Sequence, residues 1–106
     1  MDPDKPSFMI ADVVISTAGR DTGTLYYVIE GDDAWLSLVN GKDRSLERPK
    51  RKKCKHTKKV LRSETRVAQK LRAGDKVLNS ELRRDLAYLS REMQQSEVNE
   101  LWQKTT

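Results

Sequence analysis

Cysteine, histidine and aromatic residues are scarce in this 106-residue sequence, which has one Cys, one His, two Trp, three Tyr and one Phe. A single cysteine excludes an intramolecular disulfide and is typical of proteins from reducing compartments. Structural zinc needs four Cys or His ligands, whereas Cys54 and His56 are one of each and lie among lysines. No acidic residue stands between Arg48 and Arg62 to orient these two as a nucleophile–base pair. We therefore expect no metal, no cofactor and no enzymatic activity.

Long hydrophobic runs are also missing. The apolar patches at residues 8–10 and 13–15 are short and interrupted, whereas a membrane-spanning helix needs about 20 apolar residues in succession. The start Met-Asp-Pro-Asp lacks the positive charge that precedes the apolar stretch of a signal peptide. The sequence therefore predicts a soluble, cytoplasmic protein without membrane contact.

Positive charge is concentrated in one segment. Charged residues make up 35% of the chain and hydrophobic residues 36%, so the core must be small. Of the net charge of +5, residues 48–62 contribute nine bases and no acid, while residues 1–47 carry −5 and residues 63–106 carry +1. A local excess of this size produces a directed positive field, which indicates a polyanionic partner.

β-branched and aromatic residues dominate the first half of the chain, and turn residues interrupt them at short intervals. This pattern predicts strands at residues 11–18, 24–30, 34–39 and 43–47, with a short fifth strand near 54–57. Asn40-Gly41 is typical of a type I′ hairpin, which needs a positive φ at both central residues. So many short strands in a small domain favour a barrel, because closure leaves no exposed edge.

The hydrophobic period becomes helical in the last third of the chain. Ser63 and Gly74 are candidate caps of a short helix, and Asn79 or Ser80 is a candidate N-cap of a longer one. An apolar stripe at helical spacing runs along the longer helix: Leu82, Leu86, Leu89 and Met93. Residues 98–102 either extend this helix or form a last short turn. Because an isolated helix of this length is marginal in water, we expect the stripe to dock on the barrel.

The segment from Asp12 to Gly23, which reads DVVISTAGRDTG, combines a hydrophobic strand with a Gly-x-Asp-x-Gly loop, and a second strand follows at 25–29. It resembles the KOW motif of SH3-like ribosomal and transcription proteins. An Asn-Gly hairpin, the run Arg-Pro-Lys-Arg-Lys-Lys and a helical tail come next. This order is similar to that in the bacterial branch of KOW proteins, which is related to the archaeal and eukaryotic type of large-subunit ribosomal protein. The likeness covers roughly residues 11–90.

The resemblance implies an SH3-like barrel that binds RNA, usually ribosomal RNA, through the loop between its first two strands and adjoining basic residues. The loop positions concerned are Gly19, Asp21, Gly23 and Thr24. Family loops usually carry lysines on either side of the second glycine. Here Thr22 and Thr24 stand in those places, so that Arg20 is the only cation of the loop.

The basic run 48–59 is the stronger candidate for RNA contact, because a dense strip of cations displaces the counterions condensed on phosphates. Eight of its twelve residues are Lys or Arg. The predicted RNA-binding residues are Arg20, Arg48, Lys50, Arg51, Lys52, Lys53, Lys55, His56, Lys58, Lys59 and Arg62. The same run is compatible with a solvated flexible segment or a nuclear import signal.

Three aromatic residues can either stack on bases or pack in the core. Alternation along a strand places Tyr26 and Tyr27 on opposite faces, so that at most one of them faces inward. We expect Tyr27 to pack beside Leu25 and Ile29, and the role of Trp35 stays open.

Together these patterns predict an α+β protein with a mainly β core. Residues 1–9 form an N-terminal arm, residues 10–59 an SH3-like KOW barrel of about five strands, and residues 60–106 a two-helix C-terminal extension. The predicted function is binding to large-subunit ribosomal RNA, as a cytoplasmic, ribosome-associated component of translation whose tail contacts ribosomal proteins. Two alternatives stay open: a protein-interaction module whose basic run only steers association, and a DNA-binding protein that uses the C-terminal helices.

Overall fold

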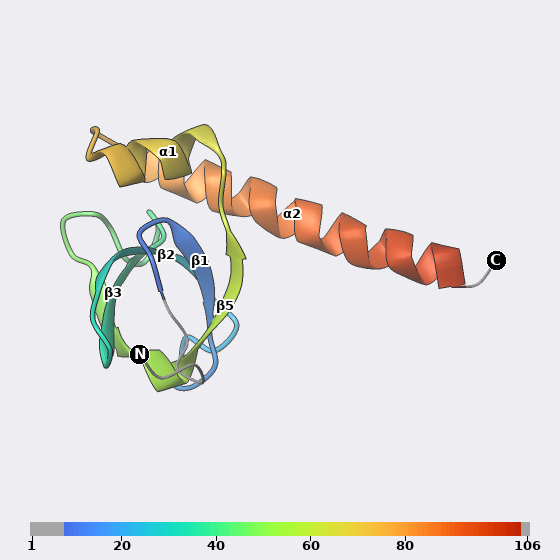
Figure 1. Cartoon of the computed structure of the whole chain (residues 1–106), viewed down its shortest axis with the longest axis horizontal. Helices are drawn as coiled ribbons and strands as arrows, with labels where there is room; N and C mark the ends of the chain where they lie inside the picture. The colour runs from blue at the N-terminus through green and yellow to red at the C-terminus, as the bar shows by residue number, and fades with distance from the viewer. Residues whose placement is uncertain (1–7, 105–106) are drawn as a thin grey trace.

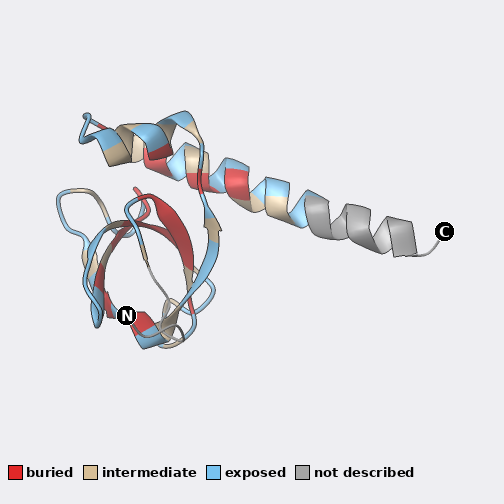
Figure 2. Cartoon of the chain, viewed as in Figure 1, coloured by how far each residue is buried: buried red, intermediate tan, exposed pale blue. Residues whose placement is uncertain are grey.

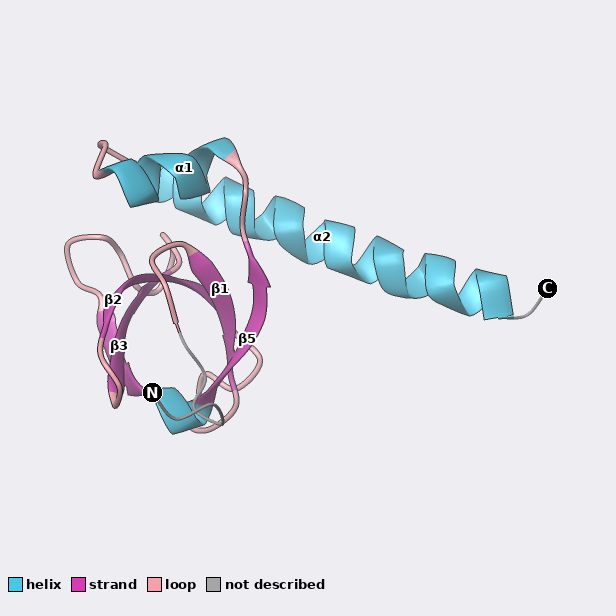
Figure 3. Cartoon of the chain, in the orientation of Figure 1, coloured by secondary structure: helices cyan, strands magenta, loops and turns pink. Residues whose placement is uncertain are grey.

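The computed structural model describes residues 8–104, and the side chains of residues 8–95. A five-stranded antiparallel sheet is followed by two helices (Figure 1, Figure 3). The strands are β1 (Asp12–Ser16), β2 (Leu25–Gly31), β3 (Trp35–Val39), β4 (Lys50–Lys53) and β5 (Thr57–Arg62). The helices are α1 (Arg66–Ala73) and α2 (Asn79–Lys104), and the 3₁₀ turn η1 (Cys54–His56) joins β4 to β5. The predicted class, α+β with a mainly β core, is confirmed.

The sheet curls on itself but is not closed by hydrogen bonds. Its strand order is β4-β3-β2-β1-β5, so the fifth strand returns to pair with the first (Figure 1). β4 and β5 are the two edges, and η1 spans the gap between them at one end. The closed barrel was therefore a wrong expectation, as was the fifth strand at 54–57. The last strand starts at Thr57, because its backbone pairs with β1 rather than with β4.

The connection from β3 to β4 is longer than the sequence suggests. The strand expected at 43–47 is absent, and residues 43–47 form bends and turns instead. The Asn40 side chain accepts hydrogen bonds from the backbone N–H groups of Lys42 and Arg44, both at 3.0 Å. Of the central pair only Gly41 has a positive φ, +75°. This is an Asn-stabilised loop rather than a type I′ hairpin, so the next strand is delayed until Lys50.

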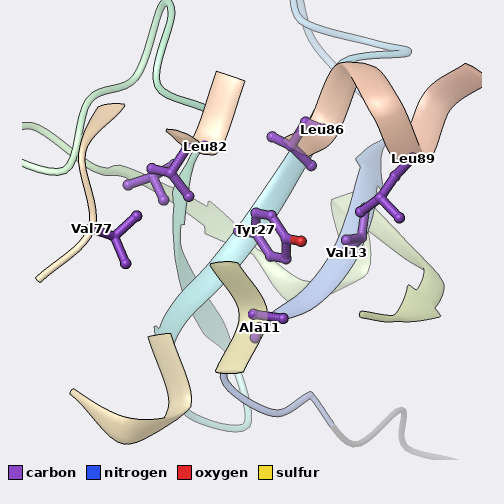
Figure 4. Packing of buried hydrophobic residues seen from close by; sticks show 9 residues of the cluster. Ala11, Val13, Tyr27, Val77, Leu82, Leu86 and Leu89 are labelled. Carbon is purple, nitrogen blue, oxygen red and sulfur yellow. The ribbon is translucent and has the colours of Figure 1, made fainter. Parts of the chain in front are cut away.

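Both faces of the curled sheet are covered, which explains why Tyr26 and Tyr27 are both buried. Tyr26 lies inside the curl with Val14 and Leu38, whereas Tyr27 lies between the sheet and the helices (Figure 4). Buried residues occur both along the strands and on the helices (Figure 2). The two rings lie on opposite faces, as expected, and only Tyr26 faces the inside of the curl; Tyr27 is buried as well because the helices cover its face. Packing of Tyr27 beside Leu25 and Ile29 is confirmed.

Helix α2 docks on the sheet through the predicted apolar stripe. Leu82, Leu86 and Leu89 are buried in one cluster with residues of β1, β2 and β3 (Figure 4). The hydroxyl of Tyr27 is hydrogen-bonded to the carboxylate of Asp85 on α2. Burial, together with this carboxylate, raises the pKa of Tyr27 to about 12. α2 continues as one helix to Lys104, so residues 98–102 extend the helix and do not form a separate turn. The side chains of these residues lie outside the described part of the structure.

The helix caps differ in part from those expected. Thr65, not Ser63, is the N-cap of α1, and its hydroxyl accepts a hydrogen bond from the backbone N–H of Ala68. Gly74 ends α1 in the left-handed region, as predicted. Asn79 is the first residue of α2, and its side-chain oxygen accepts from the backbone N–H of Leu46 at 2.8 Å. It therefore links the helix to the β3–β4 loop.

Gly41 and Gly74 provide a matched test of this docking, because both have a φ of +75°. An added Cβ at Gly74 meets nothing within 4 Å, whereas at Gly41 it would overlap the carbonyl oxygen of Asn79. Gly74→Ala should cost only the strain of a left-handed alanine, about 1–2 kcal/mol. Gly41→Ala should cost about 1–3 kcal/mol more, because it pushes α2 away from the sheet. Urea unfolding of both variants measures this difference, and equal losses would contradict the contact between this loop and α2.

Candidate nucleic-acid interface

The basic run does not form a single cationic surface, because its residues alternate between two sides of β4. Lys50 and Lys52 point toward the loop between β1 and β2, where both ammonium groups lie close to Asp21. Arg51 and Lys53 lie on the other side, over the ring of Trp35. The period of two along a strand separates these pairs. Half of the cations in β4 therefore serve the fold, and half project outward.

Asp21 is the centre of a polar cluster that ties the predicted loop to β4. Its carboxylate accepts hydrogen bonds from Lys52 Nζ at 2.9 Å, from Ser16 Oγ at 2.8 Å and from the Tyr26 hydroxyl at 2.7 Å. Lys50 Nζ lies 3.1 Å from it. Lys52 is only 8% exposed and also donates to the carbonyl of Ala18. Lys52 and Asp21 are thus engaged with each other, which leaves Lys52 little free surface for the RNA contact that the sequence predicted.

These contacts shift the pKa values of Asp21 and of Tyr26, which donates a hydrogen bond to it. Burial alone would raise the pKa of Asp21, but the hydrogen bonds from Lys52, Tyr26, Ser16 and Lys50 outweigh it and hold this pKa well below its usual range. Burial, reinforced by the neighbouring Asp21 carboxylate, raises the pKa of Tyr26. The carboxylate therefore stays ionised, and the phenol stays protonated, throughout the neutral range.

The loop between β1 and β2 is a compact turn held by its own backbone. Gly19 and Gly23 have φ values of +90° and +91°, which glycine adopts without a steric penalty. The N–H of Gly23 donates to the carbonyl of Ser16, and that of Thr24 donates to the carbonyl of Asp21. Arg20 is exposed at the tip. An added Cβ at Gly23 meets nothing within 4 Å, so backbone strain at this positive φ is what opposes a β-branched residue such as Val here.

Two cations of β5 are also paired with acids. Lys59 Nζ lies 3.2 Å from the carboxylate of Asp12, which is completely buried at the start of β1. Arg62 lies 3.5 Å from the exposed carboxylate of Glu64. A buried carboxylate needs a cation or hydrogen bonds to offset its lost hydration, so Lys59 contributes to the fold. Exposed pairs such as Arg62–Glu64 contribute little and break easily.

Four cations of β4, η1 and β5 are exposed and have no ion pair within residues 8–95, and we call them the exposed basic set. They follow one another from β4 through η1 into β5: Arg51, Lys53, Lys55 and Lys58. Arg48 is also exposed, in the loop before β4, and His56 is half-buried in η1. Of the predicted RNA-binding residues, these four, together with Arg20 and Arg48, are exposed and carry a charge that no ion pair offsets in the described residues.

Trp35, whose role the sequence left open, is the aromatic residue of this region. Its side chain is 36% exposed, with the Arg51 guanidinium 5.4 Å and the Lys53 ammonium 5.6 Å from the ring centroid. An open pocket of about 310 Å³ adjoins it. The sequence did contain a signal for this position, because Leu36 and Leu38 face the core and alternation turns Trp35 outward.

The candidate metal-binding and nucleophilic residues, Cys54 and His56, both lie in η1, between β4 and β5. Within residues 8–95, no group of three or more His, Cys, Asp or Glu side chains is placed to hold a metal ion. Cys54 is buried inside the curl, and this burial raises the pKa of its thiol. A raised pKa keeps the thiol protonated and unreactive. Neither helix of the described chain is long and apolar enough to cross a membrane.

Comparison with models of known protein families gives no match for this sequence, and comparison with curated proteins gives none either.

Proposed function

We propose that this protein binds RNA through the exposed basic set, and that its target is ribosomal RNA of the large subunit. This proposal is based on the split of the basic run into cations that are paired with an acid and cations that are not. Lys50 and Lys52 share the Asp21 carboxylate, whereas no member of the exposed basic set forms an ion pair in the described residues. Unpaired like charges repel one another, and phosphates relieve this repulsion while releasing their own counterions.

The choice of ribosomal RNA depends on the resemblance to KOW proteins. The Gly-x-Asp-x-Gly loop supports it, because Gly19 and Gly23 both take the positive φ that a tight loop between two strands requires. The strand order also fits the resemblance, because the first strand pairs with the last, as in the small curled sheet that the resemblance implies. In this proposal the protein acts in the cytoplasm, associated with the ribosome. Ribosomal proteins are further partners of its tail.

The salt dependence of binding tests the charge-driven mechanism. For the wild-type protein we expect log affinity for a large-subunit RNA fragment to fall linearly with log salt concentration. Replacing the exposed basic set with Ala should flatten this slope by about three, because each phosphate contact contributes roughly 0.7–0.9. Filter binding at several salt concentrations measures the slope. Lys50 and Lys52 are left intact, because their loss would disturb the fold.

A control variant should lose the same number of charges elsewhere. Four exposed cations outside the curled sheet serve this purpose: Lys76, Arg83, Arg84 and Arg91. Their replacement with Ala changes the net charge equally, and we expect a much smaller change of slope. If this control loses the slope instead, the binding site lies on the helices, as the DNA-binding alternative requires. Binding that is insensitive to salt would overturn the proposal.

Sedimentation separates the ribosomal target from other RNA. The native protein should travel with large ribosomal subunits in a sucrose gradient, and the variant without the exposed basic set should stay at the top. Release by ribonuclease is expected, because the contact is to RNA. Sedimentation that resists both ribonuclease and the loss of the exposed basic set would favour the protein-interaction alternative.

A further inference from the structure

Trp35 and its two cations have the composition of a nucleotide site. Trp35 leads β3, and its β4 partner in the ladder is Lys53, while Arg51 lies opposite Ser37 two positions along. Both cations lie over the ring, at 5.4 and 5.6 Å from its centroid. Attraction between a cation and an aromatic face holds them there. The indole is nevertheless 36% exposed, so that a planar group can reach it.

The backbone around Trp35 is fixed before any ligand arrives. The carboxylate of Asp32 accepts hydrogen bonds from the backbone N–H groups of Ala34 and Trp35, both at 2.8 Å. The backbone N–H of Cys54 donates to the carbonyl of Ala34 at 2.8 Å, which ties the same turn to the end of β4. A ring held on a rigid strand stacks on a ligand at a small entropic cost.

The charges around the pocket beside Trp35 differ from one side to the other, so that one side suits the base of a nucleotide and the other suits its phosphate. It is lined by Glu30, Gly31, Asp32, Leu36, Ser37 and Arg51 as well as by the indole. The carboxylates of Glu30 and Asp32 repel a phosphate but accept hydrogen bonds from the N–H groups on the edge of a base. Arg51 and Lys53 attract the phosphate. A bound nucleotide would therefore direct its base edge into the pocket and its phosphates toward β4.

We propose that Trp35, Arg51 and Lys53 form a site for an unpaired nucleotide, in which the base stacks on the indole and the adjoining phosphates contact the two cations. This inference rests on the proposed RNA binding and deepens it, because it specifies single-stranded segments as the ligand. In a duplex both faces of each base are covered by neighbouring bases, so the indole has no face to stack on. Stacking on an aromatic side chain needs a base that has left its helix.

Fluorescence and affinity measurements on the full chain test this site. Trp102→Phe leaves Trp35 as the single tryptophan, and this variant is titrated with a single-stranded RNA ten-mer and with the matching duplex. We expect the single strand to quench Trp35 fluorescence and the duplex to leave it nearly unchanged. Trp35→Ala should weaken single-strand binding by about 5- to 150-fold, the range found for one stacked base. Trp35→Phe should retain most of the affinity, because a smaller ring still stacks.

Salt dependence separates stacking from charge. Trp35→Ala should lower the affinity equally at all salt concentrations, whereas Arg51→Ala with Lys53→Ala should flatten the slope. Tyr88→Ala is the control, because Tyr88 is an aromatic residue that is 48% exposed on α2, and it should change nothing. Melting curves confirm that each variant is folded.

The outcomes distinguish this inference from the proposed function. If salt-dependent RNA binding persists but Trp35→Ala and Trp35→Phe both leave it unchanged, the nucleotide site is wrong and RNA binding stands. Equal quenching by single strand and duplex also overturns the site. If no RNA binds, and an acidic peptide quenches Trp35 instead, both proposals fail.

Discussion

Replacing Leu82 with Ala should destabilise the protein by about 3–5 kcal/mol, the usual cost of truncating a fully buried leucine. Leu82 has no exposed surface and packs in the cluster that α2 shares with Tyr27 and Val39 (Figure 4). Small domains have a free energy of unfolding of only about 5–15 kcal/mol, so the loss should be a large fraction of the total. Urea unfolding followed by circular dichroism measures it.

Leu78→Ala is the matched control. It makes the same substitution at the residue before α2, where the leucine is 53% exposed, and it should change the stability by less than about 0.5 kcal/mol.

Truncation after Arg62 extends the test, because it removes the whole helical side of the cluster. We expect the remaining sheet to melt at a lower temperature and to be cleaved faster by protease. An unchanged melting temperature in the truncated chain would contradict docking.

Replacing Asp21 with Ala should cost about 2–4 kcal/mol and loosen the loop between β1 and β2. The change removes the shared acceptor of Ser16 and Tyr26 and leaves the Lys52 ammonium buried without an anion. A buried charge without a partner is a severe penalty, and an unsatisfied hydroxyl adds to it. Thermal and urea unfolding measure the loss. Asp33→Ala is the control, because Asp33 is exposed and has no ion pair in the described part of the chain.

Acid should remove the contribution of Asp21 to stability. Because its pKa is lowered in the folded protein, the folded state favours the ionised carboxylate. This stabilisation is complete above the unfolded pKa of about 3.9 and is lost as the pH falls toward the lower folded value. The stability difference between the wild type and Asp21→Asn should therefore be constant near neutral pH and should shrink below about pH 4. A difference that grows in acid would contradict the assignment.

The Asp21 cluster also alters the design of RNA-binding variants. Removing all the cations of β4 together would lower the stability and the charge at once, because Lys50 and Lys52 hold the loop. A loss of RNA binding in such a variant would have two causes. Replacing only the exposed basic set changes the charge without touching Asp21, so a loss of binding then reports on RNA contact.

Several elements were predictable from the sequence because their causes are local. β1, β2 and β3 follow from runs of β-branched and aromatic residues. Gly74 ends α1 because a left-handed residue closes a helix most easily as glycine. The stripe on α2 follows from the helical period, and its need for a partner follows from its apolar character. The position of the charge is also a property of the sequence, since no fold changes the absence of acids between Arg48 and Arg62.

The use of each cation was decided only by the tertiary structure. Lysines at 50 and 52 and basic residues at 51 and 53 are chemically alike in the sequence, but strand β4 turns the first pair toward Asp21 and the second toward Trp35. That choice depends on the register of β4 against β3, which is set by contacts between distant segments. For the same reason Tyr26 and Tyr27 are both buried, because the curl covers one face of β2 and α2 covers the other. The amino-acid sequence determined where the positive charge lies along the chain, and the packing of the sheet determined which part of it stays exposed.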